Sequence, residues 1–368
     1  MNRGGNKITV VVVDDSALVR KLLTRMLESD PAIEVVGTAA DPYQARDRIK
    51  ETNPDVLTLD VEMPKMDGIT FLQNLMRLRP MPVVMVSSLT HKGAQVTLQA
   101  MELGAVDFVT KPGRDLSREL EDYSRDIIDK VKAAARARVQ PLDVSRIGQQ
   151  EAFQEKVQAA LREAGARQVD HVQQRQALVA VGASTGGTEA IRKLCMTLPP
   201  DAPPLVFAQH IPDSFSGPFA ERLDAVSAVS VRQASDGDAV LSGHALLAPG
   251  DRHMEVVREG SRLVIRLHDR DPVNRHRPSV DVLFDSVATA CKREAVGVLL
   301  TGMGQDGARG LLRMRQAGAR TLVQDEASSV VWGMPKAALD LGAAEETLGL
   351  EQIGERMLGL AAQQSAQA

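Results

Sequence analysis

The chain has 368 residues, which at roughly 100–200 residues per domain indicates two or three domains. Its 44 basic and 48 acidic residues give a formal net charge of -4, whereas proteins that bind the nucleic-acid backbone normally carry a basic excess. An aromatic content of 3% argues against base stacking as a main function. Two cysteines, Cys195 and Cys291, exclude a disulfide framework and a four-thiolate zinc site.

The apolar runs of the sequence are short. The first, Ile8–Val13, stops at Asp14 and is too short for the core of a signal peptide. No later run approaches the ~20 apolar residues that span a bilayer. We therefore expect a cytoplasmic protein that is not embedded in a membrane and does not bind nucleic acid.

Residues 8 to about 136 alternate β-branched runs with segments of helical period, such as Leu18, Leu22 and Met26. Each run is typical of a strand covered on both faces. The runs are Ile8–Val13, Ile33–Gly37, Val56–Leu59, Val83–Val86 and Val106–Val109. This alternation predicts an α/β domain with a doubly wound parallel sheet over residues 1–136.

Acidic residues follow two of these strands. Asp14 and Asp15 come after the first strand and Asp60 ends the third, so all three face the sheet edge where such folds bind ligands. Three convergent carboxylates suit Mg²⁺, and Asp60, the lone central acid, is the candidate nucleophile for an aspartyl-phosphate. Ser87 and Lys111, after the fourth and fifth strands, would add a hydroxyl and a cation for phosphoryl oxygens.

This set of residues resembles a response-regulator receiver domain. The matching motifs are Asp14-Asp15, Asp60-Val-Glu-Met-Pro-Lys-Met-Asp-Gly68, Ser87 and Lys111-Pro112. The resemblance implies a flavodoxin-like fold, Mg²⁺ held by the three aspartates, and transfer of phosphate to Asp60 from a chemotaxis histidine kinase. It also implies phosphoryl contacts from Ser87 and Lys111, and a rotameric switch at Phe108.

Residues 137–176 are rich in Gln, Ala and Arg and poor in β-branched residues, which indicates a linker with some helix, considered for 152–163. From Leu178 a second α/β series begins, and it predicts a second doubly wound parallel sheet over 177–362. The expected strands are Leu178–Val181, Leu205–Ala208, Ala245–Ala248, Leu263–Leu267, Val296–Leu300 and Arg320–Val323. Helices are expected over 188–196, 216–226, 281–291 and 306–317.

The segment Gly182-Ala-Ser184-Thr-Gly-Gly187 joins the first of these strands to a helix, and three interpretations compete. It could be a dinucleotide fingerprint, which would make the protein an oxidoreductase, although Ser184 replaces the middle glycine that lets backbone approach a pyrophosphate. Ser184 could simply cap the helix. It could also be a nucleophile on a sharp strand-to-helix turn, near N–H groups that stabilise an oxyanion.

A serine nucleophile needs a base and a residue that orients it. His210 ends the next strand, and Asp306 follows another strand in a glycine-rich loop, so all three residues could converge at one sheet edge. His253 and His276 are reserve candidates for the base. The pattern predicts a hydrolase that needs no cofactor at this site.

Residues 178 to about 358 resemble the catalytic domain of the chemotaxis methylesterases, which implies a Rossmann-like three-layer fold. The matching motifs are Gly182-Ala-Ser184-Thr-Gly-Gly187, Gln209-His210-Ile-Pro212, Ala248-Pro-Gly-Asp-Arg-His-Met254, Asn274-Arg-His-Arg-Pro-Ser-Val-Asp-Val-Leu-Phe284 and Thr301-Gly-Met-Gly-Gln-Asp-Gly307. The resemblance implies that Ser184 attacks, His210 moves the proton, Asp306 orients His210 and the backbone N–H of Met303 binds the oxyanion.

The same resemblance implies substrates and regulation. The substrates would be glutamate methyl esters on methyl-accepting chemoreceptors, hydrolysed to glutamate and methanol, with deamidation of receptor glutamines as a related activity. Phosphorylation at Asp60 would relieve inhibition by the first domain. The rival hypothesis is a receiver that drives a binding output, for example on nucleic acid. It would require a basic face, and only Lys130–Arg138 is a basic cluster.

Overall fold

The computed structural model describes residues 7–88, 90–111, 119–139, 141–142 and 177–366. The chain divides into two compact units between residues 143 and 144. Most of the predicted linker over 137–176, including the helix considered for 152–163, lies outside the described residues. At the end of the described part of unit 1, the N–H of Leu142 donates to the carbonyl of Met76 at 3.1 Å.

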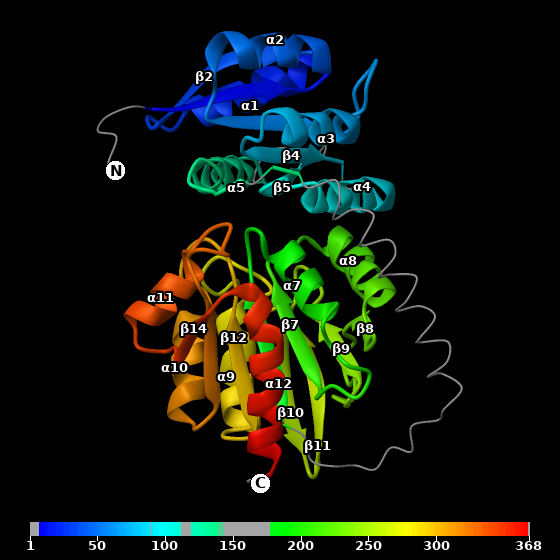
Figure 1. The fold of residues 1–368 in the computed structure, drawn as a ribbon, viewed down its shortest axis with the longest axis vertical. Helices are drawn as coiled ribbons and strands as arrows, with labels where there is room; N and C mark the ends of the chain where they lie inside the picture. Colours follow the sequence, from blue (N-terminus) through cyan, green and yellow to red (C-terminus); the bar gives the residue numbers. More distant parts are fainter. Residues whose placement is uncertain (1–6, 89, 112–118, 140, 143–176, 367–368) are drawn as a thin grey trace. The chain divides into compact units, whose positions relative to one another are not determined.

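Unit 1 is a five-stranded parallel sheet in the order β2-β1-β3-β4-β5, flanked by helices (Figure 1). All five predicted strands are confirmed. The elements are β1 (Ile8–Val13), α1 (Ala17–Glu28), β2 (Ile33–Ala39), α2 (Pro42–Thr52), β3 (Val56–Asp60), α3 (Gly68–Leu78), β4 (Val83–Ser87), α4 (His91–Glu102), β5 (Asp107–Thr110) and α5 (Glu119–Ala134).

Local sequence explains where the helices of unit 1 begin. Every residue of β3 and β4 is buried, because these central strands are covered on both faces. The helices α1 to α4 begin after Ser16, Asp41, Asp67 and Thr90, whose side-chain oxygens accept hydrogen bonds from the first-turn N–H groups. The chain therefore reaches a polar capping residue after each of β1, β2 and β3 before the next helix starts.

Unit 2 contains a seven-stranded parallel sheet in the order β14-β13-β12-β6-β7-β9-β8 and a separate two-stranded hairpin. Its elements are β6 (Leu178–Ala183), α7 (Gly187–Cys195), β7 (Leu205–Gln209), α8 (Asp213–Val226), β8 (Ser230–Gln233), β9 (His244–Leu247), β10 (His253–Glu259), β11 (Arg262–His268), α9 (Val280–Ala290), β12 (Ala295–Leu299), α10 (Ala308–Gln316), β13 (Arg320–Gln324), α11 (Met334–Asp340), β14 (Glu346–Leu348) and α12 (Leu350–Ala366). The four predicted helices correspond to α7, α8, α9 and α10.

One predicted strand of unit 2 occupies a different place from the one expected. The run Leu263–Leu267 lies in β11, which pairs antiparallel with β10 and is not part of the parallel sheet. The reason is the two-residue turn after Glu259, where Gly260 has a φ of 60° and returns the chain directly alongside itself. Strands β8, β10 and β14 and helices α11 and α12 were not predicted.

The strand order of unit 2 reverses direction at its centre. Strand β6 lies between β7 and β12, so the chain leaves β6 toward one side of the sheet and later returns to its other side. All residues of these three strands are buried. In open α/β sheets, ligands bind outside the carboxyl ends of the strands at such a reversal of strand order.

Candidate functional site

Three predicted residues of unit 2 meet at the carboxyl ends of the three central strands. Ser184 directly follows β6, His210 directly follows β7, and Asp306 lies in the loop after β12. The backbone ties the first two ends together, because the N–H of His210 donates to the carbonyl of Ala183 at 3.2 Å. The expected convergence of these side chains is what the structure shows.

The imidazole of His210 bridges the other two side chains. Its Nδ1 lies 3.0 Å from Ser184 Oγ, and its Nε2 lies 2.8 Å from Asp306 Oδ2. With the ring proton on Nε2, donated to the carboxylate, Nδ1 is free to accept the serine proton. This is the relation of nucleophile, base and orienting acid that serine hydrolases require.

Asp306 is held by a dense set of donors at the start of α9. Its Oδ1 accepts from Asn274 Nδ2 at 2.6 Å and Ser279 Oγ at 2.8 Å, and its Oδ2 accepts from the N–H of Val280 at 2.7 Å. Burial alone would raise the pKa of this carboxyl, but the hydrogen bond and charge of His210, together with these donors, hold its pKa well below the usual range. Asp306 is therefore a fixed anion.

The turn that carries Ser184 is made from small residues for steric reasons. Gly186 has a φ of 76°, and a Cβ there would lie 2.6 Å from Val330 Cβ. A Cβ on Gly187 would lie 2.1 Å from the side-chain oxygen of Gln209, and one on Gly302 would lie 2.8 Å from Ser184 Cβ. The glycines allow α7 to start at once after β6 and allow the loop after β12 to approach the serine.

The predicted oxyanion donor lies in that approaching loop. The N–H of Ser184 donates to the carbonyl of Thr301 at 3.0 Å, and the N–H groups of Gly333 and Met334 both donate to the carbonyl of Gly302. Among the described residues, the N–H of Met303 has no hydrogen-bond acceptor. It therefore remains available as a donor one residue beyond the glycine that touches the serine.

The two reserve histidines also lie at this site. The ring of His276 stacks on that of His210, with centroids 3.6 Å apart and an interplanar angle of 10°. His253 is fully buried, and its Nδ1 accepts from the N–H of Ser279 at 3.3 Å. His210, not either of these, is the histidine that bridges Ser184 and Asp306. The supporting contacts of Asn274 and Ser279 were not predicted.

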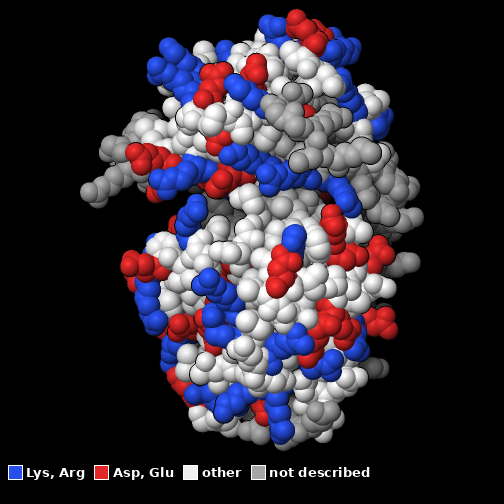
Figure 2. All heavy atoms as spheres, turned by 90° about the vertical axis from the view of Figure 1, so that its left-hand side faces the viewer, with Lys and Arg blue, Asp and Glu red and all other residues white. Residues whose placement is uncertain are grey.

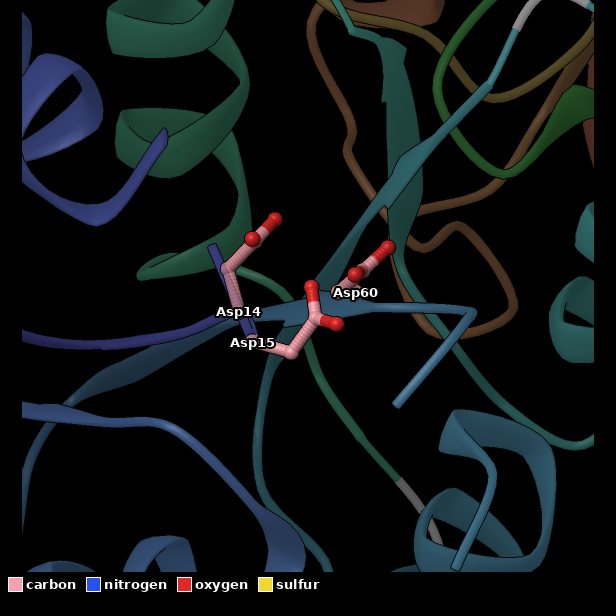
Figure 3. A group of neighbouring side chains, drawn as sticks. All are labelled: Asp14, Asp15 and Asp60. Atoms are coloured by element: carbon pink, nitrogen blue, oxygen red, sulfur yellow. The ribbon is translucent and has the colours of Figure 1, made fainter. Parts of the chain in front are cut away.

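The second set of predicted residues lies in unit 1. Asp14 and Asp15, in the loop after β1, and Asp60, at the end of β3, bring their carboxylates side by side (Figure 3). One oxygen from each of the three lies within 4.8 Å of the others. Asp14 and Asp60 are buried and Asp15 is exposed, so the cluster is open to solvent on one side.

Lys111 faces the two buried carboxylates. Its Nζ lies 3.0 Å from Asp14 Oδ2 and 2.8 Å from Asp60 Oδ2, yet neither oxygen has a well-aligned hydrogen bond. Burial raises the pKa of Asp60 to about 6, with the charge of Asp14 adding to burial and Lys111 opposing it. Hard carboxylate oxygens left without aligned donors fit a divalent cation such as Mg²⁺.

The two remaining predicted residues of unit 1 lie on neighbouring strands. Ser87 is buried at the end of β4, where its hydroxyl donates to the carbonyl of Gly93 at 3.3 Å. Phe108 is buried in β5, and the ammonium of Lys130 lies 5.5 Å from its ring centroid. The Lys111 ammonium therefore contacts the carboxylates of Asp14 and Asp60. The Ser87 hydroxyl is instead directed toward α4.

Two further features bear on the kinds of partner the chain suits. On the face drawn in Figure 2, acidic and basic side chains are interspersed, in keeping with the small net charge. No helix among the described residues combines the length and apolar composition needed to cross a bilayer.

Comparisons with known proteins assign both units. The family model of the response regulator receiver domain matches residues 10–120, and that of the CheB methylesterase matches residues 179–357. A protein-glutamate methylesterase/protein-glutamine glutaminase 1 of Xanthomonas campestris pv. campestris is 57% identical, covering 97% of this chain and 98% of that protein. A protein-glutamate methylesterase/protein-glutamine glutaminase 2 of Bordetella avium is 56% identical, covering 96% of this chain and 97% of that protein.

A solved structure is also similar to part of this chain. The catalytic domain of the Thermotoga maritima CheB methylesterase is 34% identical, with a TM-score of 0.49, and the match covers 50% of this chain and 98% of that one. The identity to full-length relatives extends through both units. The chain therefore belongs to the family of chemotaxis protein-glutamate methylesterases/protein-glutamine glutaminases, in which a receiver domain is joined to a methylesterase domain.

Proposed function

We propose that the protein hydrolyses γ-glutamyl methyl esters of chemoreceptors to glutamate and methanol. The observation that carries the proposal is the bridging of Ser184 and Asp306 by His210, at 3.0 and 2.8 Å. Family membership supports the substrate, because the relatives are named protein-glutamate methylesterases.

In the proposed reaction, Ser184 Oγ attacks the ester carbonyl as His210 Nδ1 takes its proton. The tetrahedral oxyanion accepts a hydrogen bond from the N–H of Met303, and the carboxylate of Asp306 stabilises the imidazolium that forms on His210. The imidazolium then protonates the departing methoxide, so methanol leaves and an acyl-enzyme remains. Water, deprotonated by His210, attacks the acyl-enzyme, and His210 returns the proton to Ser184 Oγ as the bond to the glutamate breaks. With ammonia as the leaving group, the same steps deamidate a glutamine, the second activity in the relatives' names.

We also propose that phosphorylation of Asp60 by a chemotaxis histidine kinase activates the hydrolase. Asp14, Asp15 and Asp60 would hold Mg²⁺, which supplies positive charge for phosphoryl oxygens. Lys111, already 2.8 Å from Asp60, would pair with the phosphoryl group. Ser87 would have to turn its hydroxyl away from Gly93 to contact that group, and Phe108 is the candidate switch residue.

The test is methanol release from methylated chemoreceptor membranes, with and without Mg²⁺ and beryllofluoride as a phosphoryl mimic. We expect release that rises with the mimic and disappears in Ser184→Ala. Release that is indifferent to the mimic would remove the activation proposal and retain the hydrolase. Absence of release from folded wild-type protein in both states would contradict the proposed activity.

A further inference from the structure

A four-residue turn from Val273 to His276 lies against the Ser–His–Asp arrangement. Val273 and His276 form an isolated antiparallel bridge, with N–H to carbonyl distances of 3.1 and 2.9 Å. The two central residues, Asn274 and Arg275, have φ values of 52° and 68°. Two successive positive φ angles are typical of a type I′ turn, which favours Asn first and Gly second.

Arg275 occupies the position of this turn where glycine would be least strained. The left-handed conformation of a non-glycine residue costs about 1–2 kcal/mol of conformational energy. Such a conformation persists where contacts with the surrounding structure hold the backbone in place. Arg275 itself is exposed, so its side chain is not what fixes the conformation. The contacts that can hold the turn come from its neighbours on either side, Asn274 and His276.

These neighbours reach two different members of the triad. Asn274 Nδ2 donates to Asp306 Oδ1 at 2.6 Å and to Asp281 Oδ2 at 2.7 Å. His276 stacks on His210 at 3.6 Å and 10°. The turn therefore supports the orienting carboxylate by hydrogen bonding and the imidazole by ring stacking, through two separate side chains.

The stack restrains a motion that the hydrogen bonds leave open. The bonds to Ser184 and Asp306 act at the edge of the His210 ring, through Nδ1 and Nε2, and fix its position in the ring plane. A parallel ring at 3.6 Å opposes tilting of that plane, and its π face also attracts the ring when it carries positive charge.

We propose that the turn 273–276 is a positioning device for the triad, and that His276 is a positioning residue that sets the plane of the His210 imidazole. The inference rests on the proposed hydrolase function. It assigns the main contribution of His276 to its aromatic ring, through the stack on His210. Phenylalanine should then replace His276, whereas a side chain of similar size without a ring should not.

The experiment compares His276→Phe and His276→Leu in the full chain. The matched control is His244→Leu, because His244 begins β9 at the amino end of a parallel strand, at the sheet edge opposite the triad. The readouts are kcat and KM for methanol release and the rate at which a fluorophosphonate probe labels Ser184. Thermal melting checks the folding of each variant, and His276→Gln replaces the leucine variant if the latter does not fold.

We expect His276→Leu to lower kcat and the labelling rate roughly 5- to 30-fold, with KM within about twofold. His276→Phe should stay within about threefold of wild type, and His244→Leu should match wild type. Equal rates for His276→Leu and wild type would overturn the proposal, and so would equal losses in the Phe and Leu variants. If wild type is labelled but releases no methanol, the substrate assignment fails, and the labelling rates still test His276.

Discussion

Replacing Asp306 with asparagine tests the triad because it changes one carboxylate oxygen into an NH₂ group and leaves the size of the side chain almost unchanged. In the wild type, Oδ2 faces His210 Nε2 and the N–H of Val280, and Oδ1 faces Asn274 Nδ2 and Ser279 Oγ. An asparagine amide must direct its NH₂ group toward one of these two sets. An NH₂ group at the Oδ1 position would face the amide of Asn274, whose other proton is engaged by Asp281.

At the Oδ2 position the NH₂ group leaves only the N–H of Val280 without an acceptor, so this orientation loses fewer hydrogen bonds. The amide then donates to His210 Nε2, which moves the ring proton to Nδ1. That proton points at Ser184 Oγ, 3.0 Å away, and the histidine no longer accepts from the serine. A wrong tautomer lowers kcat by about 10⁴-fold, equivalent to about 5 kcal/mol.

The stability of the same variant depends on pH in a defined direction. Burial opposes ionisation of Asp306, but the hydrogen bond from His210 and its other donors hold the pKa below the ordinary value of 3.8. A lowered pKa contributes stability above the unfolded-state value, and this contribution is lost as pH falls further. The variant should therefore be less stable than wild type at pH 7, and the difference should shrink below about pH 4.

The assay is methanol release at saturating receptor, with melting curves of both proteins from pH 3 to 7. Asp306→Glu and Ser184→Ala serve as controls for geometry and for background hydrolysis. A folded Asp306→Asn variant that keeps more than a tenth of the wild-type kcat would refute the reasoning, because the carboxylate would then not set the tautomer of His210.

Three further outcomes are expected. Gly302→Ala should lower kcat at least about tenfold, because the new Cβ would lie 2.8 Å from Ser184 Cβ and 2.3 Å from Met334 Sδ; a wild-type rate would show that the loop can move aside. Gly186→Ala should destabilise unit 2 by about 1–3 kcal/mol in denaturant titration, since its φ is 76° and Val330 leaves no room, and an unchanged midpoint would contradict this. Mg²⁺ affinity by calorimetry should fall about tenfold from pH 7 to pH 5, because protons compete for Asp60, whose pKa is about 6; a flat profile would exclude Asp60 as the titrating ligand.

Much of the architecture could be predicted because it follows from short-range patterns. Central strands β6 and β12 are continuous apolar runs, and β3 is interrupted only by Thr58 before it ends in Asp60. The polar residues at or after the carboxyl ends of such strands lie at the ligand-binding edge of a parallel sheet. The strands that escaped prediction lack that signal. In β10 charged residues interrupt the apolar ones, and β14 has only three residues.

The support around the triad could not be predicted in the same way. Asn274 and Ser279 contact Asp306 across 32 and 27 residues of sequence, through a loop that belongs to no regular element. Such contacts depend on where α9 starts in space, and helical or strand periodicity does not encode that. Ser279 did carry one readable sign, since a serine before an apolar helix is a preferred N-cap.

The orientation of the His210 ring has a consequence for how such a site can be built. Nδ1 lies near the backbone and faces the serine of the adjacent strand, while the outer nitrogen Nε2 reaches past β6 to the loop after β12. The width of the imidazole ring thus matches the spacing of the strands. Nδ1 contacts a residue at the end of the neighbouring strand, and Nε2 contacts a residue that follows the strand beyond it. Any parallel sheet with three consecutive strand ends in the order acid, serine, histidine has the framework for grafting this triad, whatever the order of those strands along the chain.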